Sequence, residues 1–235
     1  MGKIVITGAS SAIGWEIAKV LSTMNKPMLL HGNKKKELPL NELSCEAEFV
    51  TADFSSFPEL EEFIAYLSDV DILINAAAYT VTELLPQSSD ESIDKMVAVN
   101  INALVKICKA VIPSMCIKRS GIIVNISSST ASKVYRGQSI YAGTKAFAET
   151  FSKGIAAEYG RKGVRCNCVA PGAINSGSLT LLANIADDQL KQLNAVSRLG
   201  DPQDVANTVA FLCKDESAYI NGSVLHVDGG HWLGI

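Results

Sequence analysis

The sequence has few charged residues and no long apolar run. Charged residues make up 19% of the 235 residues, and the net charge is −3, which gives no reason to expect a nucleic-acid or membrane-surface partner. No apolar run reaches the roughly 18 residues that a bilayer-spanning helix needs. The chain opens directly on a strand-like run, Lys3–Thr7, without the apolar core of a signal peptide. We therefore expect a cytoplasmic protein that binds neither nucleic acid nor membrane.

Patterns for metals, disulfides and phosphate loops are also missing. The six cysteines include no CxxC pair, and reduced, mostly buried thiols are the expectation for such a chain. The three histidines, His31, His226 and His231, have no spacing that would close a zinc site, so no metal is predicted. No lysine follows the glycine-rich turn near the N-terminus, which argues against an ATPase or kinase.

Short apolar runs instead alternate with longer helical patterns. Strands are predicted at 3–7, 28–31, 47–51, 72–75, 121–126, 164–169 and 224–227. Helices are predicted at 12–24, 57–67, 88–115, 139–159 and 202–213. This alternation predicts a single α/β domain over residues 1–235, a Rossmann fold with a doubly wound parallel sheet of about seven strands and helices on both faces. The long excursion at about 175–198 is predicted to be a substrate lid.

The first predicted strand leads into a glycine-rich turn, Thr7–Gly14, and then a helix. Gly8 can adopt a tight turn, small residues after it let the backbone approach a pyrophosphate, and Gly14 allows close helix packing. The helix N-terminus would direct free N–H groups and a positive partial charge at the phosphates. The pattern favours a dinucleotide site, and a turn without a ligand is the alternative.

The end of the second predicted strand bears on the choice of cofactor. An acidic residue there would bind the ribose 2′-hydroxyl of NAD and repel a 2′-phosphate. Here His31 and Asn33 are followed by three lysines, Lys34–Lys36, and no carboxylate occurs before Glu37. The sequence thus favours NADP(H) over NAD(H), with Asn33 and Lys34 near the 2′-phosphate, although a solvated basic loop would look the same.

Tyr141 and Lys145 are four residues apart, which places them on one face of a predicted helix. A phenol has a pKa near 10, and a nearby ammonium would lower it, so that Tyr141 could donate a proton to a carbonyl oxygen as a hydride arrives at carbon. The pair is weak evidence alone. It gains weight because the preceding strand ends in three serines, Ser127–Ser129, at the sheet edge where α/β proteins bind ligands.

Taken together, the chain resembles the short-chain dehydrogenases/reductases from residue 3 to the C-terminus. The motifs occur in the family's order and are jointly specific: Thr7–Gly14, Asp53, Asn75–Ala78, Asn100, Ser128, Tyr141 with Lys145, and Pro171–Gly172. Departures are Ala12 for the middle glycine of the turn, Asn75–Ala78 for the family's NNAG, and Ser11 where NADP enzymes often carry a basic residue.

The resemblance implies specific roles. Ser128, thirteen positions before Tyr141, is implied as the catalytic serine, and Asn100 as the residue that helps hold a water linking Lys145 to solvent. Lys145 is also expected to bind the nicotinamide ribose. Asp53 and Phe54 are implied near the adenine, Asn75 and Ala76 near its ribose, and Ile174 and Ser176 near the carboxamide. The full set implied for the cofactor is Gly8, Ala9, Ser10, Ser11, Ile13, Gly14, Asn33, Lys34, Asp53, Phe54, Asn75, Ala76, Tyr141, Lys145, Pro171, Gly172, Ile174 and Ser176.

Within the family, the 197–230 region is most like the 3-oxoacyl-(acyl-carrier-protein) reductases. The resemblance implies NADPH-dependent reduction of a 3-oxoacyl thioester, bound to the carrier protein or free, by a homotetramer or dimer. An acidic carrier would favour basic residues near the entrance, for which Lys118, Arg119, Arg161 and Lys162 are candidates, with ordinary surface charge as the alternative. Another secondary alcohol, sugar or secondary-metabolite intermediate is the alternative substrate. A non-catalytic cofactor-binding regulator is a remote alternative, because all four catalytic residues are present.

Overall fold

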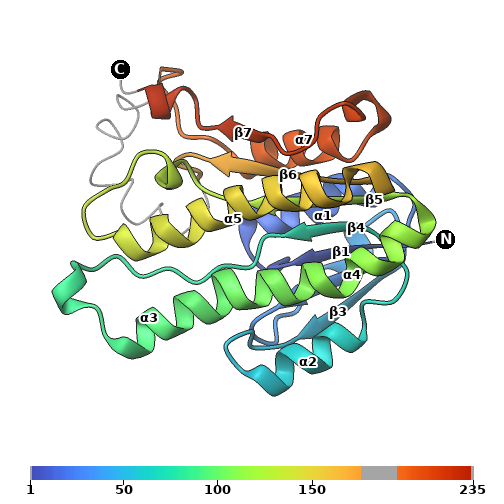
Figure 1. Cartoon of the computed structure of the whole chain (residues 1–235), viewed down its shortest axis with the longest axis horizontal. Coiled ribbons are helices and arrows are strands. Elements are labelled where there is room, and N and C mark those ends of the chain that lie inside the picture. Colours follow the sequence, from blue (N-terminus) through green and yellow to red (C-terminus); the bar gives the residue numbers. More distant parts are fainter. Residues whose placement is uncertain (1, 176–194, 234–235) are drawn as a thin grey trace.

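The computed structural model describes residues 2–175 and 195–233. In this part of the chain, parallel strands form one sheet in the order β3-β2-β1-β4-β5-β6-β7 (Figure 1). The strands are β1 (Lys3–Thr7), β2 (Met28–Gly32), β3 (Ala47–Thr51), β4 (Val70–Asn75), β5 (Gly121–Ile126), β6 (Val164–Pro171) and β7 (Val224–Val227). The strand order reverses between β1 and β4, and ligands of such sheets bind at the carboxyl ends of the strands beside this switch point.

Helices cover both faces of the sheet, which confirms the predicted fold class (Figure 1). On one face α1 packs with α7, and on the other lie α2, α4 and α5. The helices are α1 (Ala12–Ser22), α2 (Phe57–Ala65), α3 (Asp90–Val97), α4 (Leu104–Lys118), α5 (Ser139–Tyr159) and α7 (Pro202–Leu212). Short 3₁₀ turns are η1 (Leu40–Glu42), η2 (Leu85–Gln87), η4 (Ser129–Ala131), η5 (Gly160–Lys162), η6 (Asp215–Ser217) and η7 (His231–Leu233).

The predicted helix at 88–115 is interrupted. α3 and α4 are joined by a π-helical turn, η3 (Ala98–Ala103), that contains the buried Asn100. The continuous run Asp90–Lys118 is long and apolar enough to cross a membrane by length and composition. Its apolar side chains Ile107, Val111 and Met115 are buried in the core against the sheet, which accounts for that composition.

Most of the predicted lid, together with the implied carboxamide contact Ser176, falls on residues 176–194, outside the described part of the chain. On either side of that gap, Ile174 and Gly200 form a parallel β-bridge. The chain therefore leaves β6 and returns toward α7 at neighbouring points beside the carboxyl edge of the sheet.

Candidate active site

The turn after β1 requires glycine at both of its ends. Gly8 has a φ of +69°, and a Cβ there would lie 2.6 Å from the backbone nitrogen of Ala77. A Cβ on Gly14 would lie 2.2 Å from the carbonyl oxygen of Gly8. Real Cβ atoms do not approach backbone atoms so closely, so the turn can pack against both the loop after β4 and the start of its own helix only with glycine at these positions.

Ser11 fixes the start of α1. Its hydroxyl accepts a hydrogen bond from the Gly14 N–H at 3.0 Å and donates one to the Gly8 carbonyl at 2.8 Å. This N-cap leaves the first turn of α1 open at the edge of the sheet, where helix N–H groups and the helix dipole favour an anion. Ala9 is fully buried, and its N–H donates to the His31 carbonyl, which ties the turn to β2.

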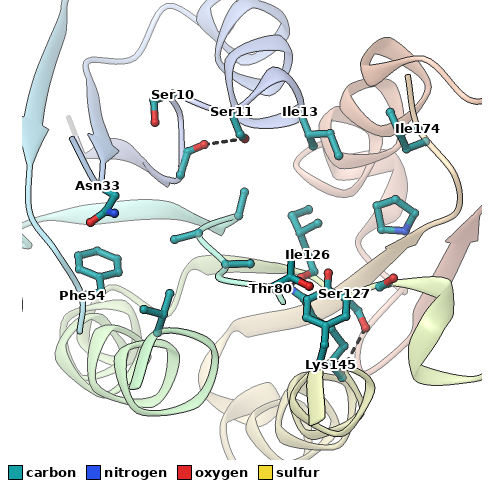
Figure 2. A pocket seen from close by; sticks show the side chains of 18 of the residues that line it. Ser10, Ser11, Ile13, Asn33, Phe54, Thr80, Ile126, Ser127, Lys145 and Ile174 are labelled. Carbon is teal, nitrogen blue, oxygen red and sulfur yellow. Dashed lines mark hydrogen bonds between the residues drawn. The ribbon is translucent and has the colours of Figure 1, made fainter. Parts of the chain in front are cut away.

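A cavity of about 470 Å³ runs along the carboxyl edge of the sheet beside this turn. Ser10, Asn33 and Phe54 lie toward one end, while Ser127 and Lys145 lie at the other (Figure 2). The cavity is lined by these residues from the sequence prediction: Gly8, Ser10, Ser11, Ile13, Asn33, Phe54, Ala76, Ser128, Tyr141, Lys145, Pro171, Gly172 and Ile174. The structure thus brings the glycine-rich turn and the Tyr–Lys pair into one elongated site.

Several predicted residues do not line this cavity: Ala9, Gly14, Lys34, Asp53, Asn75 and Asn100. The Asp53 carboxylate accepts hydrogen bonds from Ser55 and lies 3.5 Å from the Lys95 ammonium. Lys95 and the Ser55 hydrogen bonds hold the pKa of this carboxyl below its ordinary value, although burial opposes them. The Asn75 amide donates to Asn125 at 2.8 Å and so braces β4 against β5.

The reacting end of the cavity is built from β5 and α5. Ser128 follows β5 in extended conformation, and its hydroxyl donates to Thr130 Oγ1 at 3.0 Å. Tyr141 and Lys145 lie on the first turns of α5, with Lys145 Nζ 5.7 Å from the centre of the Tyr141 ring. Lys145 Nζ donates to the carbonyl of Ile126 at 2.8 Å, which anchors the ammonium at the end of β5.

Burial governs the protonation of these groups. It lowers the pKa of Lys145 to about 8, so at neutral pH the side chain is mostly an ammonium. Burial raises the pKa of Tyr141, and a hydrogen bond with Ser128 opposes the shift. The sequence led us to expect a lowered Tyr141 pKa. The direction is opposite because desolvation of the phenolate dominates, and Tyr141 is a neutral phenol, a proton donor, at physiological pH.

Both polar atoms of the Asn100 side chain form hydrogen bonds within the fold. Its Oδ1 accepts from the Tyr79 N–H at 2.8 Å, and its Nδ2 donates to the Tyr79 carbonyl and to Thr144 Oγ1. It thus links the loop after β4 to α5. Asn100 and Lys145 also line a second cavity of about 20 Å³, room for a single water, which includes Asn75. Asn75 Oδ1 is buried there without a hydrogen-bond partner in the described structure.

The sequence interpretation gave His31 no role in the site, yet the structure places it against the turn. The ring is 2% exposed and stacks on Phe54, with centroids 3.8 Å apart. Its Nδ1 accepts from the Gly8 N–H, so Nε2 carries the proton that is donated to the Ala52 carbonyl at 2.9 Å. Burial lowers the pKa of His31 to about 4. The sequence carries no signal for this position, because a single histidine at the end of an apolar strand has the same sequence pattern whether its role is structural or functional.

The four basic candidates for carrier binding lie at the wrong edge for this chain's own cavity. Lys118 and Arg119 end α4 just before β5, and Arg161 and Lys162 precede β6, so all four lie at the amino ends of the strands. Lys118 is also paired with Asp69 and Asp71. The expectation that they flank the entrance of the same chain's site is wrong, because parallel strands place these turns opposite the carboxyl edge.

Comparisons with known proteins agree with this geometry. A family model described as "Enoyl-(Acyl carrier protein) reductase" matches residues 8–231. The chain is 36% identical to a 3-oxoacyl-(acyl-carrier-protein) reductase of Escherichia coli, over 99% of this chain and 98% of that one. It is 32% identical to nodulation protein G of Rhizobium meliloti, over 97% and 96% of the two chains. A solved "short chain dehydrogenase/reductase family protein" superposes with a TM-score of 0.90 at 28% identity, covering 99% of this chain and 97% of that chain.

Proposed function

The chain belongs to the short-chain dehydrogenase/reductase family, and from that premise we propose that it uses NADPH to reduce a 3-oxoacyl thioester to the 3-hydroxyacyl product. Membership makes it an NAD(P)-dependent oxidoreductase acting on a carbonyl or an alcohol. The observation that carries the proposal is the single cavity that holds the glycine-rich turn at one place and Ser128, Tyr141 and Lys145 at another. The full-length similarity to a 3-oxoacyl-(acyl-carrier-protein) reductase supports the choice of substrate.

The cavity fits a nicotinamide dinucleotide. Gly8 and Gly14 form a cradle that any Cβ would fill, and the open N-terminus of α1 lies beside it to receive the pyrophosphate. Asn33 and Phe54 lie where the adenosine would bind, and Ile174 and Lys145 where the nicotinamide and its ribose would bind. The 2′-phosphorylated form is proposed because no acidic side chain is positioned at the end of β2.

In the proposed mechanism, bound NADPH supplies the hydride to the carbonyl carbon. Tyr141 donates its phenolic proton to the carbonyl oxygen, and Ser128 donates a hydrogen bond to the same oxygen. The Lys145 ammonium stabilises the phenolate that remains on Tyr141. Asn100 and Asn75 border the water-sized cavity behind Lys145, through which a proton can return to the site.

We propose a homotetramer or dimer as the working form. Apolar side chains on α4 and α5 that are not fully covered support this, because Ile117 is 85% exposed and the stacked rings of Phe147 and Phe151 are only partly buried against the core. Large apolar side chains left on a helix surface are typical of subunit contacts.

The experiment is NADPH oxidation by the purified chain against a panel of substrates. The panel pairs 3-oxoacyl thioesters, such as acetoacetyl thioesters of coenzyme A and of a carrier protein, with simple ketones and sugars, and every assay is repeated with NADH. We expect the highest kcat/KM for a 3-oxoacyl thioester with NADPH. Preference for a ketone without a thioester, or for a sugar, would replace the proposed substrate by the alternative one, and turnover of none would favour a cofactor-binding regulator.

A further inference from the structure

The segment that joins Ser128 to α5, residues 129–138 and here called the active-site loop, is attached to the turn that follows β7. Tyr135 and His231 share a hydrogen bond between the phenolic oxygen and Nε2, although 96 positions separate the two residues. Their rings also stack, with centroids 5.6 Å apart and an angle of 28° between the ring planes. Lys133 Nζ donates to the His231 carbonyl at 3.2 Å, which attaches the same loop at a second point.

The turn after β7 is itself held firmly. His231 is 5% exposed, and its N–H donates to the Asp228 carbonyl at 3.2 Å. The Asp228 carboxylate accepts from the Gly230 N–H at 3.0 Å. A Cβ on Gly172 would lie 2.7 Å from Asp228 Cβ, so the turn packs directly against a residue that lines the cavity. The turn therefore offers the active-site loop a fixed support beside the cavity.

The active-site loop depends on such contacts because core packing does not hold its middle part. Residues 132–136 include no buried side chain, and Val134 is 58% exposed. On its other side the loop is attached to the segment after β4, where the Glu83 N–H donates to the Gly137 carbonyl at 2.9 Å. The loop is thus held between two supports, and the contact of Tyr135 belongs to the one formed by the turn after β7.

The position of the loop is passed on to the start of α5. The Tyr135 carbonyl accepts from the Gln138 N–H at 3.1 Å, and the Gln138 carbonyl accepts from the Ala142 N–H at 2.8 Å. Gln138 is the N-cap of α5, and its side chain forms no capping hydrogen bond. The orientation of the first turn therefore relies on the main chain of the loop. Two main-chain hydrogen bonds connect Tyr135 to this turn, which carries Tyr141.

We propose that Tyr135 and His231 are positioning residues for the reduction, and that their contact holds the active-site loop so that Ser128 and Tyr141 can reach one carbonyl oxygen together. The inference rests on the proposed function, because that oxygen belongs to its substrate. Neither Tyr135 nor His231 is among the residues that line the cavity, so both act through the loop. Displacing a reacting group by about 1 Å can cost about 100-fold in rate, so a loosened loop should slow turnover far more than it weakens binding of the dinucleotide.

The kinetic test compares variants of the full chain. Tyr135→Phe keeps the ring and loses the hydroxyl, and His231→Leu loses the ring nitrogens. Tyr66→Phe is the matched control, because Tyr66 is 44% exposed against 37% for Tyr135 and lies at the end of α2. NADPH oxidation is measured with the best carbonyl substrate of the panel, and NADPH affinity by fluorescence titration.

We expect Tyr135→Phe and His231→Leu each to lower kcat by about tenfold, the effect of losing one hydrogen bond, with substrate KM within about threefold and NADPH affinity within about twofold. The double variant should be no slower than the slower single variant by more than about twofold, because both changes break the same contact. His231→Gln, whose amide can still bond the phenol, should recover most of kcat, and Tyr66→Phe should match the wild type.

Hydrogen exchange of the cofactor-free chain tests the hold on the loop without any substrate. Amides in a peptide covering residues 129–142 should exchange about fivefold or more faster in Tyr135→Phe than in the wild type, while peptides from β1 and α1 stay unchanged. Because Tyr135 is partly exposed, this variant decides the question even if His231→Leu folds poorly.

Four outcomes would count against the proposal. Unchanged exchange in residues 129–142 would show that the pair does not hold the loop, whatever the substrate. Faster exchange with a wild-type kcat would show that the reaction does not need the loop held. An equal loss of kcat and of NADPH affinity would mean a general disturbance of the site. A wild type that turns over no carbonyl of the panel would refute the proposed function and the catalytic part of this proposal, while faster exchange would still establish the hold on the loop.

Discussion

Acid should destabilise the protein through His31. The ring is buried and neutral, with Nδ1 accepting from the Gly8 N–H and Nε2 donating to the Ala52 carbonyl. Protonation of Nδ1 would turn that acceptor into a donor facing another donor. Burial lowers the His31 pKa from 6.5 to about 4 in the folded chain, so between these values the unfolded chain binds the proton more readily.

The sign and size follow from this difference. The stabilisation from a neutral His31 is complete above pH 6.5 and is lost as the pH falls toward 4. The two pKa values, 6.5 and about 4, differ by about 2.5, and each pKa unit is worth about 1.4 kcal/mol, so the full contribution to the free energy of unfolding is about 3 kcal/mol. About 2 kcal/mol of this contribution is lost between pH 8 and pH 5.

Urea unfolding of the wild type and of His31→Gln across this pH range isolates the effect. Carboxylates titrate in both proteins and cancel in the difference between their free energies of unfolding. At pH 8 the variant should be less stable, because the stack on Phe54 and the fit around the turn are lost. The difference between the two proteins should then shrink by about 2 kcal/mol at pH 5. A difference that stays constant, or a His31 ring signal in NMR that titrates near 6.5, would refute this reasoning.

Two further predictions concern the framework of the site. Gly14→Ala places a methyl 2.2 Å from the Gly8 carbonyl, so we expect a loss of about 1–3 kcal/mol in stability together with weaker dinucleotide binding, measured by urea unfolding and cofactor titration; wild-type values for both would contradict the close packing. Asn125→Ala removes the partner of Asn75 Nδ2 and of Ser152 Oγ in the buried sheet, and should cost about 1–3 kcal/mol in unfolding free energy; a cost under about 0.5 kcal/mol would show that these groups find other partners.

The parts of the fold that follow local patterns were predictable. Apolar runs such as Val164–Val169 predict strands, and the glycine positions of the first turn follow from backbone geometry that the structure confirms. The π-helical turn around Asn100 was not predictable, because one extra residue in a turn leaves the apolar pattern of a long helix nearly unchanged.

Contacts between distant segments were beyond the sequence interpretation. Lys36 is the one of three adjacent lysines that donates to the Ser10 carbonyl, and this depends on the path of the loop after β2, which composition does not encode. The same holds for His31, whose partners come from two other segments. The prediction that Arg119 and Lys162 lie near the entrance of the site was wrong for a different reason. It came from the resemblance to the family, whereas the direction of the parallel strands places both residues at the opposite edge of the sheet.

The most direct test of the central claim is the turnover of Tyr141→Phe, measured as NADPH oxidation with a 3-oxoacyl thioester alongside NADPH affinity. Tyr159→Phe, at the opposite end of α5, is the matched control. If Tyr141 is the proton donor, its variant should lose about 100-fold or more in kcat while NADPH affinity stays within about twofold, and the control should behave as the wild type. Turnover by Tyr141→Phe at the wild-type rate would contradict the account.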